Sequence, residues 1–367
     1  RSSDLLVLIF VMQVVTMMAQ EKADTLRTVS EGTNPSELGM IRRTIRGFDR
    51  LEDEYIEPQH YESTVMGQVT RTYESFSLGS NGQSIKLSPD GQLKVGRYFG
   101  WRWIFLGYTF SIDKLGFDSN GLRKEFDISI YSSRVGIDFY YRRTGHDYKI
   151  RDVKLGYGID GDLFEDIPFS GVNVGMTGLS AYYIFNHGRF SYPAAFGQST
   201  CQKISCGSWL AGAGYTNNTL DLDYEHLHRT LNSRMPIGEE IKLDSGLMFK
   251  SVKYNDFMLS GGYAYNWVFA RNWLLGGSIQ LTASHKRSTG EMSDRKSRSF
   301  SIQNLNLDGI GRFALVYNNM KWYAGCSVVM HTYNYSLSQF STNNTFGSAN
   351  LYVGINFGLK KKYREKK

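Results

Sequence analysis

The sequence predicts an all-β protein: an antiparallel transmembrane β-barrel of roughly 12 strands, preceded by a short amphipathic helix. Three observations predict this fold. An apolar run near the N-terminus is followed at once by charged residues, long segments downstream alternate apolar with polar residues, and short turns alternate with long polar loops. The composition, with 38 Gly, 24 Tyr and 22 Phe against 6 Pro, suits strands, and 41% hydrophobic residues exclude disorder.

The first element is a signal peptide, which we expect at residues 1–19. Residues 5–15 (LLVLIFVMQVV) have the length of its apolar core, and Ala19 stands at a plausible cleavage point. The run is too short to span a bilayer, and no later stretch reaches the ~18 apolar residues of a transmembrane helix. We therefore expect export to the outer membrane of a Gram-negative bacterium, which excludes nucleic acid as a partner.

Residues 20–65 are expected to form a periplasmic segment with one amphipathic helix at Ser36–Asp53. Asn34-Pro35-Ser36 is a helix start signal, and the apolar side chains of this helix fall on one stripe, away from its arginines. The stripe consists of Leu38, Ile41, Ile45 and Phe48. We expect the helix to pack on the base of the barrel; contact with the membrane surface and a plug in the lumen are the alternatives.

Residues 66–359 are expected to form the barrel itself. In the last segment Leu351, Val353 and Ile355 share one face, and Tyr352, Gly354 and Asn356 share the other. A period of two indicates strands, and it fits either a soluble sandwich or a membrane barrel. Segments such as 259–269 and 273–286 reach the ~9–11 residues that a tilted strand needs to cross a bilayer, which favours the membrane barrel.

The connections between these strands alternate between short and long, as in a membrane barrel. Residues 270–272 and 318–319 are short turns, whereas 286–298 and 338–347 are long polar loops. Aromatic residues gather at the short turns, where interfacial girdles lie: Trp267, Phe269, Trp273, Tyr317, Trp322 and Tyr323. In the middle of the chain 179–185, 189–196 and 204–215 read as strands, while 148–174 and 219–244 are either loops or irregular strands.

A basic tail at residues 360–367 (KKKYREKK) follows the barrel. Its six basic residues and one acidic residue give +5, most of the net charge of +7 of the whole chain. Lipid headgroups of the outer membrane or a periplasmic or outer-membrane protein are therefore the expected acidic partners.

Two stretches carry a family resemblance. Residues 189–215 (RFSYPAAFGQSTCQKISCGSWLAGAGY) and Tyr55-Ile56-Glu57-Pro58 resemble an uncharacterised outer-membrane β-barrel family of Bacteroidota. The matching positions are Phe190, Ser191, Tyr192, Pro193, Ala194, Ala195, Phe196, Gln202, Lys203, Ser205, Gly207 and Ser208. The chain departs from the family pattern at Cys206 and in its basic tail, where Phe357 is the substitute for a terminal aromatic residue. The resemblance implies the fold and the compartment, and no activity.

Proline inside the segment 189–196 is the oddest local feature. Pro193 cannot donate a hydrogen bond to a strand ladder, so we expect a bulge in a strand at Pro193, Ala194 and Ala195. The alternative is a constriction of the lumen by these three residues.

Candidate ligand residues are few. Glu225, His226 and His228 read as a solvated loop without a further metal ligand at a suitable spacing, and we predict no metal and no cofactor. Cys201 and Cys206 could form a local disulfide or remain two inert thiols, and Cys326 has no obvious partner.

The leading functional hypothesis is a narrow channel or transport component. Its lumen candidates are polar residues of the strand faces: Asp138, Ser278, Gln280, Asn306, Arg312, Tyr352 and Asn356. The alternative is a structural or assembly subunit with a closed lumen that docks a partner. A lipid-acting enzyme is a third hypothesis, for which His285 or His331 would have to meet a serine; we predict no enzyme, since no Gly-x-Ser-x-Gly motif is present.

Overall fold

The computed structural model describes residues 51–101, 104–111, 124–144, 147–156, 161–236, 240–292, 299–336 and 341–364. Glu52–Lys367 forms one compact unit. The predicted signal peptide at 1–19 and the predicted helix at Ser36–Asp53 lie outside the described residues, except for 51–53, which are not helical. Among the described helices, none is long and apolar enough to span a membrane.

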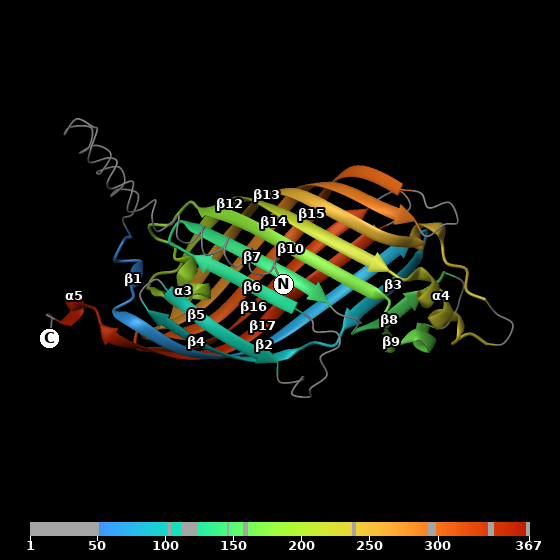
Figure 1. Ribbon diagram of the computed structural model, residues 1–367. Helices are drawn as coiled ribbons and strands as arrows, with labels where there is room; N and C mark the ends of the chain where they lie inside the picture. Colours follow the sequence, from blue (N-terminus) through green and yellow to red (C-terminus); the bar gives the residue numbers. More distant parts are fainter. Residues whose placement is uncertain are drawn as a thin grey trace, which may run out of the picture. The chain divides into compact units, whose positions relative to one another are not determined.

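Twelve strands of the described chain follow one another in a single antiparallel sheet (Figure 1). Their order across the sheet is β5, β4, β2, β17, β16, β15, β14, β13, β12, β10, β7 and β6. Their bounds are β2 Tyr61–Ser80, β4 Leu93–Trp101, β5 Ile104–Ser111, β6 Lys124–Tyr131, β7 Val135–Thr144, β10 Val172–Ile184, β12 Cys206–Leu222, β13 Phe249–Ala270, β14 Trp273–Met292, β15 Ser299–Asn318, β16 Trp322–Ser336 and β17 Ser341–Leu359. The prediction of an antiparallel barrel of roughly 12 strands is confirmed.

The sheet curls around an interior, which we call the lumen. Arg312 on β15 contacts Asp138 on β7, although four strands lie between β15 and β7 along the sheet. The first barrel strand begins at Tyr61 rather than at residue 66, and the last ends at Leu359.

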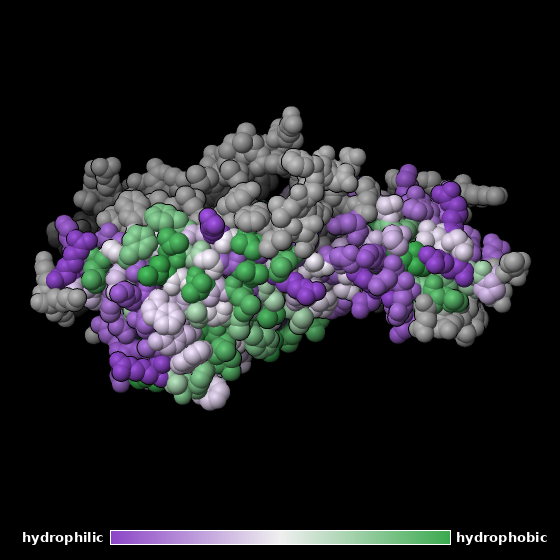
Figure 2. All heavy atoms as spheres, turned by 90° about the horizontal axis from the view of Figure 1, so that it is seen from below, coloured by the Kyte–Doolittle hydropathy of each residue, from purple (hydrophilic) through white to green (hydrophobic). Residues whose placement is uncertain are grey.

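Alternation along the strands places apolar side chains outside and polar ones inside. On β14, Ser278, Gln280 and Ser284 are at most 2% exposed, whereas Leu281 is 57% exposed. Large apolar side chains on neighbouring strands are also 60–73% exposed: Phe257, Leu259, Leu305, Leu307 and Leu351. Figure 2 shows hydrophobic residues over much of the wall that it views. This inverts the pattern of a soluble sheet and is the outer surface of a transmembrane barrel.

Tyrosine and glycine occupy facing positions on the inner wall. Four inward pairs lie directly opposite each other on neighbouring strands: Tyr140 and Gly178, Tyr182 and Gly136, Tyr323 and Gly354, and Tyr352 and Gly325. A Cβ added at any of these glycines would lie 2.2–2.7 Å from the tyrosine that faces it. The missing side chain therefore lets each ring lie against the wall, and these pairs are one use of the many glycines and tyrosines in the sequence.

One end of the barrel, here called the turn end, carries the short connections at 132–134, 271–272 and 319–321. It also holds β1 (Ile56–Pro58), which pairs with β11 (Thr200–Gln202), together with α3 (Tyr192–Phe196) and α5 (Lys361–Arg364). Rings at this end form a continuous chain from Trp267 through Phe269, Trp273 and Tyr317 to Trp322, with centroids 4.7–6.1 Å apart.

The opposite end, here called the loop end, holds a hydrophobic core that is continuous with side chains inside the barrel. The elements that extend this core beyond the barrel strands are β3 (Gln83–Pro89), β8 (Tyr148–Lys154), β9 (Ile167–Phe169), α4 (Tyr224–Asn232), η1 (Gly161–Phe164) and η2 (Ser245–Leu247). Ile85, Ile150 and Leu227 are completely buried in this core. Residues 148–174 therefore contain regular strands, and 219–244 contain the end of β12 and a helix.

Glu225, His226 and His228 lie on α4, so the predicted loop conformation is wrong. The helix forms because Asp223 caps its N-terminus by accepting a hydrogen bond from the backbone N–H of His226 at 2.9 Å. Leu227 and Leu231, one turn apart, are buried against the core of the loop end.

Candidate functional site: the lumen

The residues that the sequence assigns to the lumen are distributed along its inner wall. Six of them are 8% exposed or less: Asp138, Ser278, Gln280, Arg312, Tyr352 and Asn356. Asn306 is half-buried on β15. They do not form one site, since they contact different layers of side chains that cross the lumen one above another.

The middle layer is an ion pair. Arg312 Nη2 donates to the carboxylate of Asp138, which also accepts a hydrogen bond from the Ser129 hydroxyl at 2.7 Å. The guanidinium carbon of Arg312 lies 5.5 Å from the centre of the Tyr182 ring. Arg312 is only 1% exposed, and a charge buried to this degree is tolerated when an opposite charge accompanies it. The pair therefore crosses the middle of the lumen with side chains from opposite walls.

An aromatic layer lies next to this pair. The rings of His331 on β16 and Phe346 on β17 stack with centroids 5.0 Å apart. Tyr140 on β7 donates from its hydroxyl to that of Tyr333 on β16 at 3.1 Å, and the guanidinium carbon of Arg142 lies 4.4 Å from the centre of the Phe346 ring. Since β7 is on the far side of the sheet from β16 and β17, these contacts also cross the lumen.

A second buried ionic group, which was not predicted from the sequence, lies nearer the loop end. Lys286 Nζ lies 3.1 Å from Asp308 Oδ1, 3.9 Å from Asp256 Oδ2 and 2.6 Å from the backbone oxygen of Asn334. The sequence could have indicated this group. Lys286 and the lumen candidate Gln280 are an even number of residues apart on β14, so their side chains lie on the same face of the strand.

The segment with Pro193 is a helix and not a strand with a bulge. Residues Tyr192–Phe196 form α3, and Ser191 caps it by accepting a hydrogen bond from the backbone N–H of Ala194 at 3.2 Å. Proline suits the first turn of a helix, where its missing N–H would have had no helical partner. The prediction of a strand over 189–196 is therefore wrong, because a cap and a proline in this order begin a helix.

This helix lies inside the turn end of the barrel. Tyr192 donates from its hydroxyl to Ser278 Oγ on β14 at 3.1 Å, and Gln198 Nε2 donates to the Tyr352 hydroxyl on β17 at 2.9 Å. Ala195 packs against Gly276, where an added Cβ would lie 2.6 Å from the Ala195 Cβ. Two of the predicted lumen residues, Ser278 and Tyr352, thus hold the α3 segment in place.

Gln202 joins α3 to the N-terminal segment and to the barrel wall. Its Oε1 accepts from the backbone N–H of Ser191 at 2.8 Å and from Asn266 Nδ2 on β13 at 3.3 Å. Its Nε2 donates to the backbone oxygens of Arg189 and Tyr55, at 2.6 and 3.3 Å. Two further contacts hold the same segment. Arg189 Nε forms an ion pair with Glu52 at 2.8 Å, and β1 pairs with β11.

The remaining candidates show no assembled chemistry. His331 lies among aromatic rings and its Nδ1 has no hydrogen-bond partner, while His285 lies on the outer face of β14 opposite Phe257 and Leu305. Cys201, Cys206 and Cys326 are free thiols, so no disulfide joins Cys201 to Cys206. No group of three or more His, Cys, Asp or Glu side chains among the described residues could hold a metal ion.

Comparison with known families gives one match. The family described as domain of unknown function DUF4421 matches residues 50–357, which is most of the chain and includes all twelve barrel strands except the last two residues of β17. The chain belongs to this family. No curated protein matches it.

Solved structures with similar folds are outer-membrane proteins. The outer membrane protease OmpT from Escherichia coli is 9% identical with a TM-score of 0.34, over 84% of this chain and 99% of that one. The translocator domain of the autotransporter NalP from Neisseria meningitidis is 10% identical with a TM-score of 0.34, over 94% and 98%. The toluene transporter TodX of P. putida is 7% identical with a TM-score of 0.24, over 82% and 91%. Such low scores carry no functional information.

Proposed function

We propose that this member of the DUF4421 family is an outer-membrane barrel whose lumen is closed at rest, and that it serves as a structural or docking subunit. The observation that carries the proposal is the contact of Arg312 with Asp138 across the lumen. The aromatic layer on one side of this pair and the α3 segment on the other add further side chains that cross the lumen, which supports a closed state. A passive diffusion channel needs a continuous column of water.

Two features support the outer membrane as its location. The outer face of the barrel is apolar, with Leu259 70% and Leu305 73% exposed, and the aromatic chain at the turn end suits a membrane interface. The proposal places the turn end in the periplasm and the loop end outside the cell. We also propose that the protein is exported by a signal peptide and comes from a member of the Bacteroidota.

We propose that a partner binds at the turn end. Lys361, Lys362 and Arg364 of α5 are exposed there and suit an acidic protein surface or lipid phosphates. The segment from Glu52 to Pro58 lies at the same end and connects any partner of the N-terminal residues to α3 through Gln202.

Single-channel recording in planar bilayers tests the closed lumen. We expect no stepwise current from the purified protein. The double variant Tyr192→Ala with Gln198→Ala, which removes two of the hydrogen bonds that hold the α3 segment, provides the comparison, and His285→Ala on the outer face is the matched control. Regular current steps from the unmodified protein would overturn the closed-lumen proposal.

The way in which α3 is attached to the barrel wall supports the channel hypothesis in one respect. A helix of five residues that is held to the wall by side-chain hydrogen bonds, and by no strand pairing of its own, can leave its place without unfolding a strand. A channel that opens on a signal would therefore show current steps in the double variant and none in the unmodified protein. Membrane fractionation and heat-modifiable gel mobility test the barrel, and recovery in the soluble periplasm would refute the location.

A further inference from the structure

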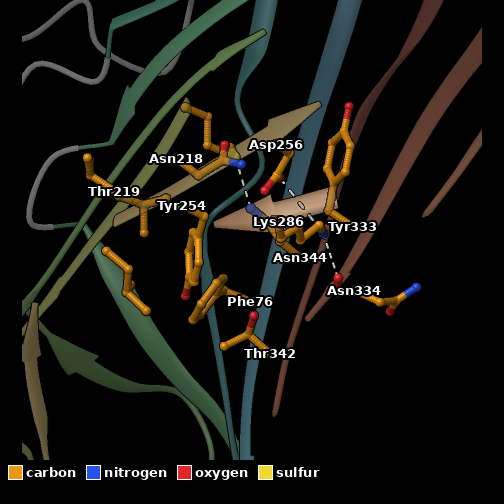
Figure 3. Close-up of a pocket in the computed structure, with 13 residues that line it drawn as sticks. Phe76, Asn218, Thr219, Tyr254, Asp256, Lys286, Tyr333, Asn334, Thr342 and Asn344 are labelled. Atoms are coloured by element: carbon orange, nitrogen blue, oxygen red, sulfur yellow. Dashed lines mark hydrogen bonds and ion pairs between the residues drawn. The ribbon is translucent and has the colours of Figure 1, made fainter. Parts of the chain in front are cut away.

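A small cavity lies within the lumen toward the loop end, and nothing in the closed-lumen proposal uses it. Its volume is about 30 Å³, which is enough for about one water molecule or one ion of that size. Figure 3 shows Asp256, Lys286 and Asn344 among the residues that line it. The lining comes from β2, β10, β12, β13, β14, β16 and β17, so the cavity is enclosed by strands from both sides of the lumen.

Three side-chain oxygens that line this cavity can only accept hydrogen bonds and are left without partners. Asp256 Oδ1, Asn218 Oδ1 and Asn344 Oδ1 are buried and have no hydrogen-bond partner among the described residues. Asp256 is 1% exposed and Asn344 is 9% exposed, so water outside the protein does not satisfy them. Three unmet oxygens that line one cavity favour an occupant that offers positive charge or hydrogen-bond donors.

The charges beside the cavity are unequal in number. Lys286 is accompanied by two carboxylates, Asp308 at 3.1 Å and Asp256 at 3.9 Å, which leaves one negative charge in excess. Lys286 Nζ already donates to Asp308 and to the backbone oxygen of Asn334, so two of its three N–H groups are used, and Asp256 Oδ1 accepts no hydrogen bond among the described residues. One monovalent cation would balance the group.

We propose that this cavity binds a single monovalent cation of about the size of a water molecule, such as Na⁺ or K⁺. Its ligands are the oxygens of Asp256, Asn218 and Asn344. A carboxylate together with amide oxygens is the donor type that hard cations prefer. A divalent ion is disfavoured, because it would leave a positive charge in excess beside Lys286. The site is independent of whether the lumen conducts ions.

Binding can be measured on the full-length protein in detergent micelles. We expect ²³Na⁺ resonance broadening that K⁺ reverses and choline, which is too large for the cavity, does not. We also expect the urea midpoint of unfolding to rise to a plateau with NaCl or KCl, and to stay lower in choline chloride at the same ionic strength. Equal midpoints in all three salts would overturn the proposal, and would mean that a proton or water balances the cavity.

Variants separate the site from a general salt effect. Asp256→Asn removes the excess charge while leaving Lys286 paired with Asp308, so the protein should fold and bind Na⁺ at least about tenfold more weakly. Asn344→Leu removes a neutral ligand and should act in the same direction. Asp221→Asn, an exposed carboxylate beyond the cavity on β12, is the control and should leave binding unchanged. Unchanged Na⁺ binding in both Asp256→Asn and Asn344→Leu would refute this site.

Discussion

Tyr140 on β7 lies directly opposite Gly178 on β10, and a Cβ at residue 178 would lie 2.2 Å from Cζ of the Tyr140 ring. Tyr140 cannot move away freely, because its ring contacts Phe346 at 5.3 Å between centroids and its hydroxyl donates to Tyr333. The aromatic layer in the lumen therefore depends on a glycine in the wall.

Gly178→Ala should destabilise the barrel by about 1–3 kcal/mol, the usual cost of overpacking a close-packed interior. Urea unfolding in micelles measures the change. Gly261→Ala is the matched control, since a Cβ there meets nothing within 4 Å. Combining Gly178→Ala with Tyr140→Ala should cost less than the sum of the two single changes, and strict additivity would contradict the packing relationship.

Removing one partner of the buried ion pair should be more harmful than removing both. Asp138→Ala leaves Arg312 charged and unpaired in the lumen, and we expect a loss of about 3–5 kcal/mol. The double variant Asp138→Ala with Arg312→Ala leaves no buried charge at that layer and should recover part of the loss. A double-mutant cycle of unfolding free energies measures the coupling, and a coupling near zero would show that the two side chains do not interact.

Acid should loosen the loop end. Hydrogen bonds from Ser80, Asn81 and the backbone N–H of Gly246 hold the pKa of Asp244 below its usual value of 3.8. The stabilisation is therefore complete above pH 3.8 and is lost as the pH falls through the lower pKa of the folded state. We expect pepsin cleavage within 240–248 to accelerate across this window. Asp244→Asn should cleave at a nearly constant rate there, and an equally steep pH response in the variant would exclude Asp244 as the cause.

Cys201 should be a poor nucleophile. Its burial, with Glu57 nearby, raises the pKa of this thiol to about 12. The thiolate is the reactive form, so alkylation at pH 8 should be at least ~100-fold slower in the folded protein than in urea. Mass spectrometry of the alkylated peptides gives both rates. Glu52→Ala, which breaks the ion pair with Arg189 at the turn end, should speed the reaction if the β1–β11 pairing opens, and fast labelling of the unmodified protein would contradict the burial.

Alternation was sufficient to predict the wall of the barrel, because inward and outward positions are fixed by parity along each strand. Gln280, Arg312 and Tyr352 are examples of lumen candidates that are buried, as parity requires. Parity does not say which inward residues meet across the lumen. Arg312 and Asp138 are 174 residues apart in the sequence, and only the curl of the sheet brings them together.

The helix α3 could not be predicted from the alternation of apolar and polar residues. Its five residues are too few for a helical period to be visible, and the aromatic residues around Pro193 look like those of a strand. The cap at Ser191 followed by proline in the first turn was the signal that distinguishes the two. Lys286 and its two aspartates were also visible by parity, but a charge on a strand face reads first as a loop residue.

The α3 segment is part of the connection between β10 and β12, and these two strands are neighbours in the wall. Both of its ends are therefore continuous with the ring of strands, and β1 pairs with its second half at β11. A segment tethered in this way stays attached to the wall at both ends. If the proposed opening occurs, the segment swings outward on its own connections and returns to the same place, so we expect the opening at the turn end to be reversible.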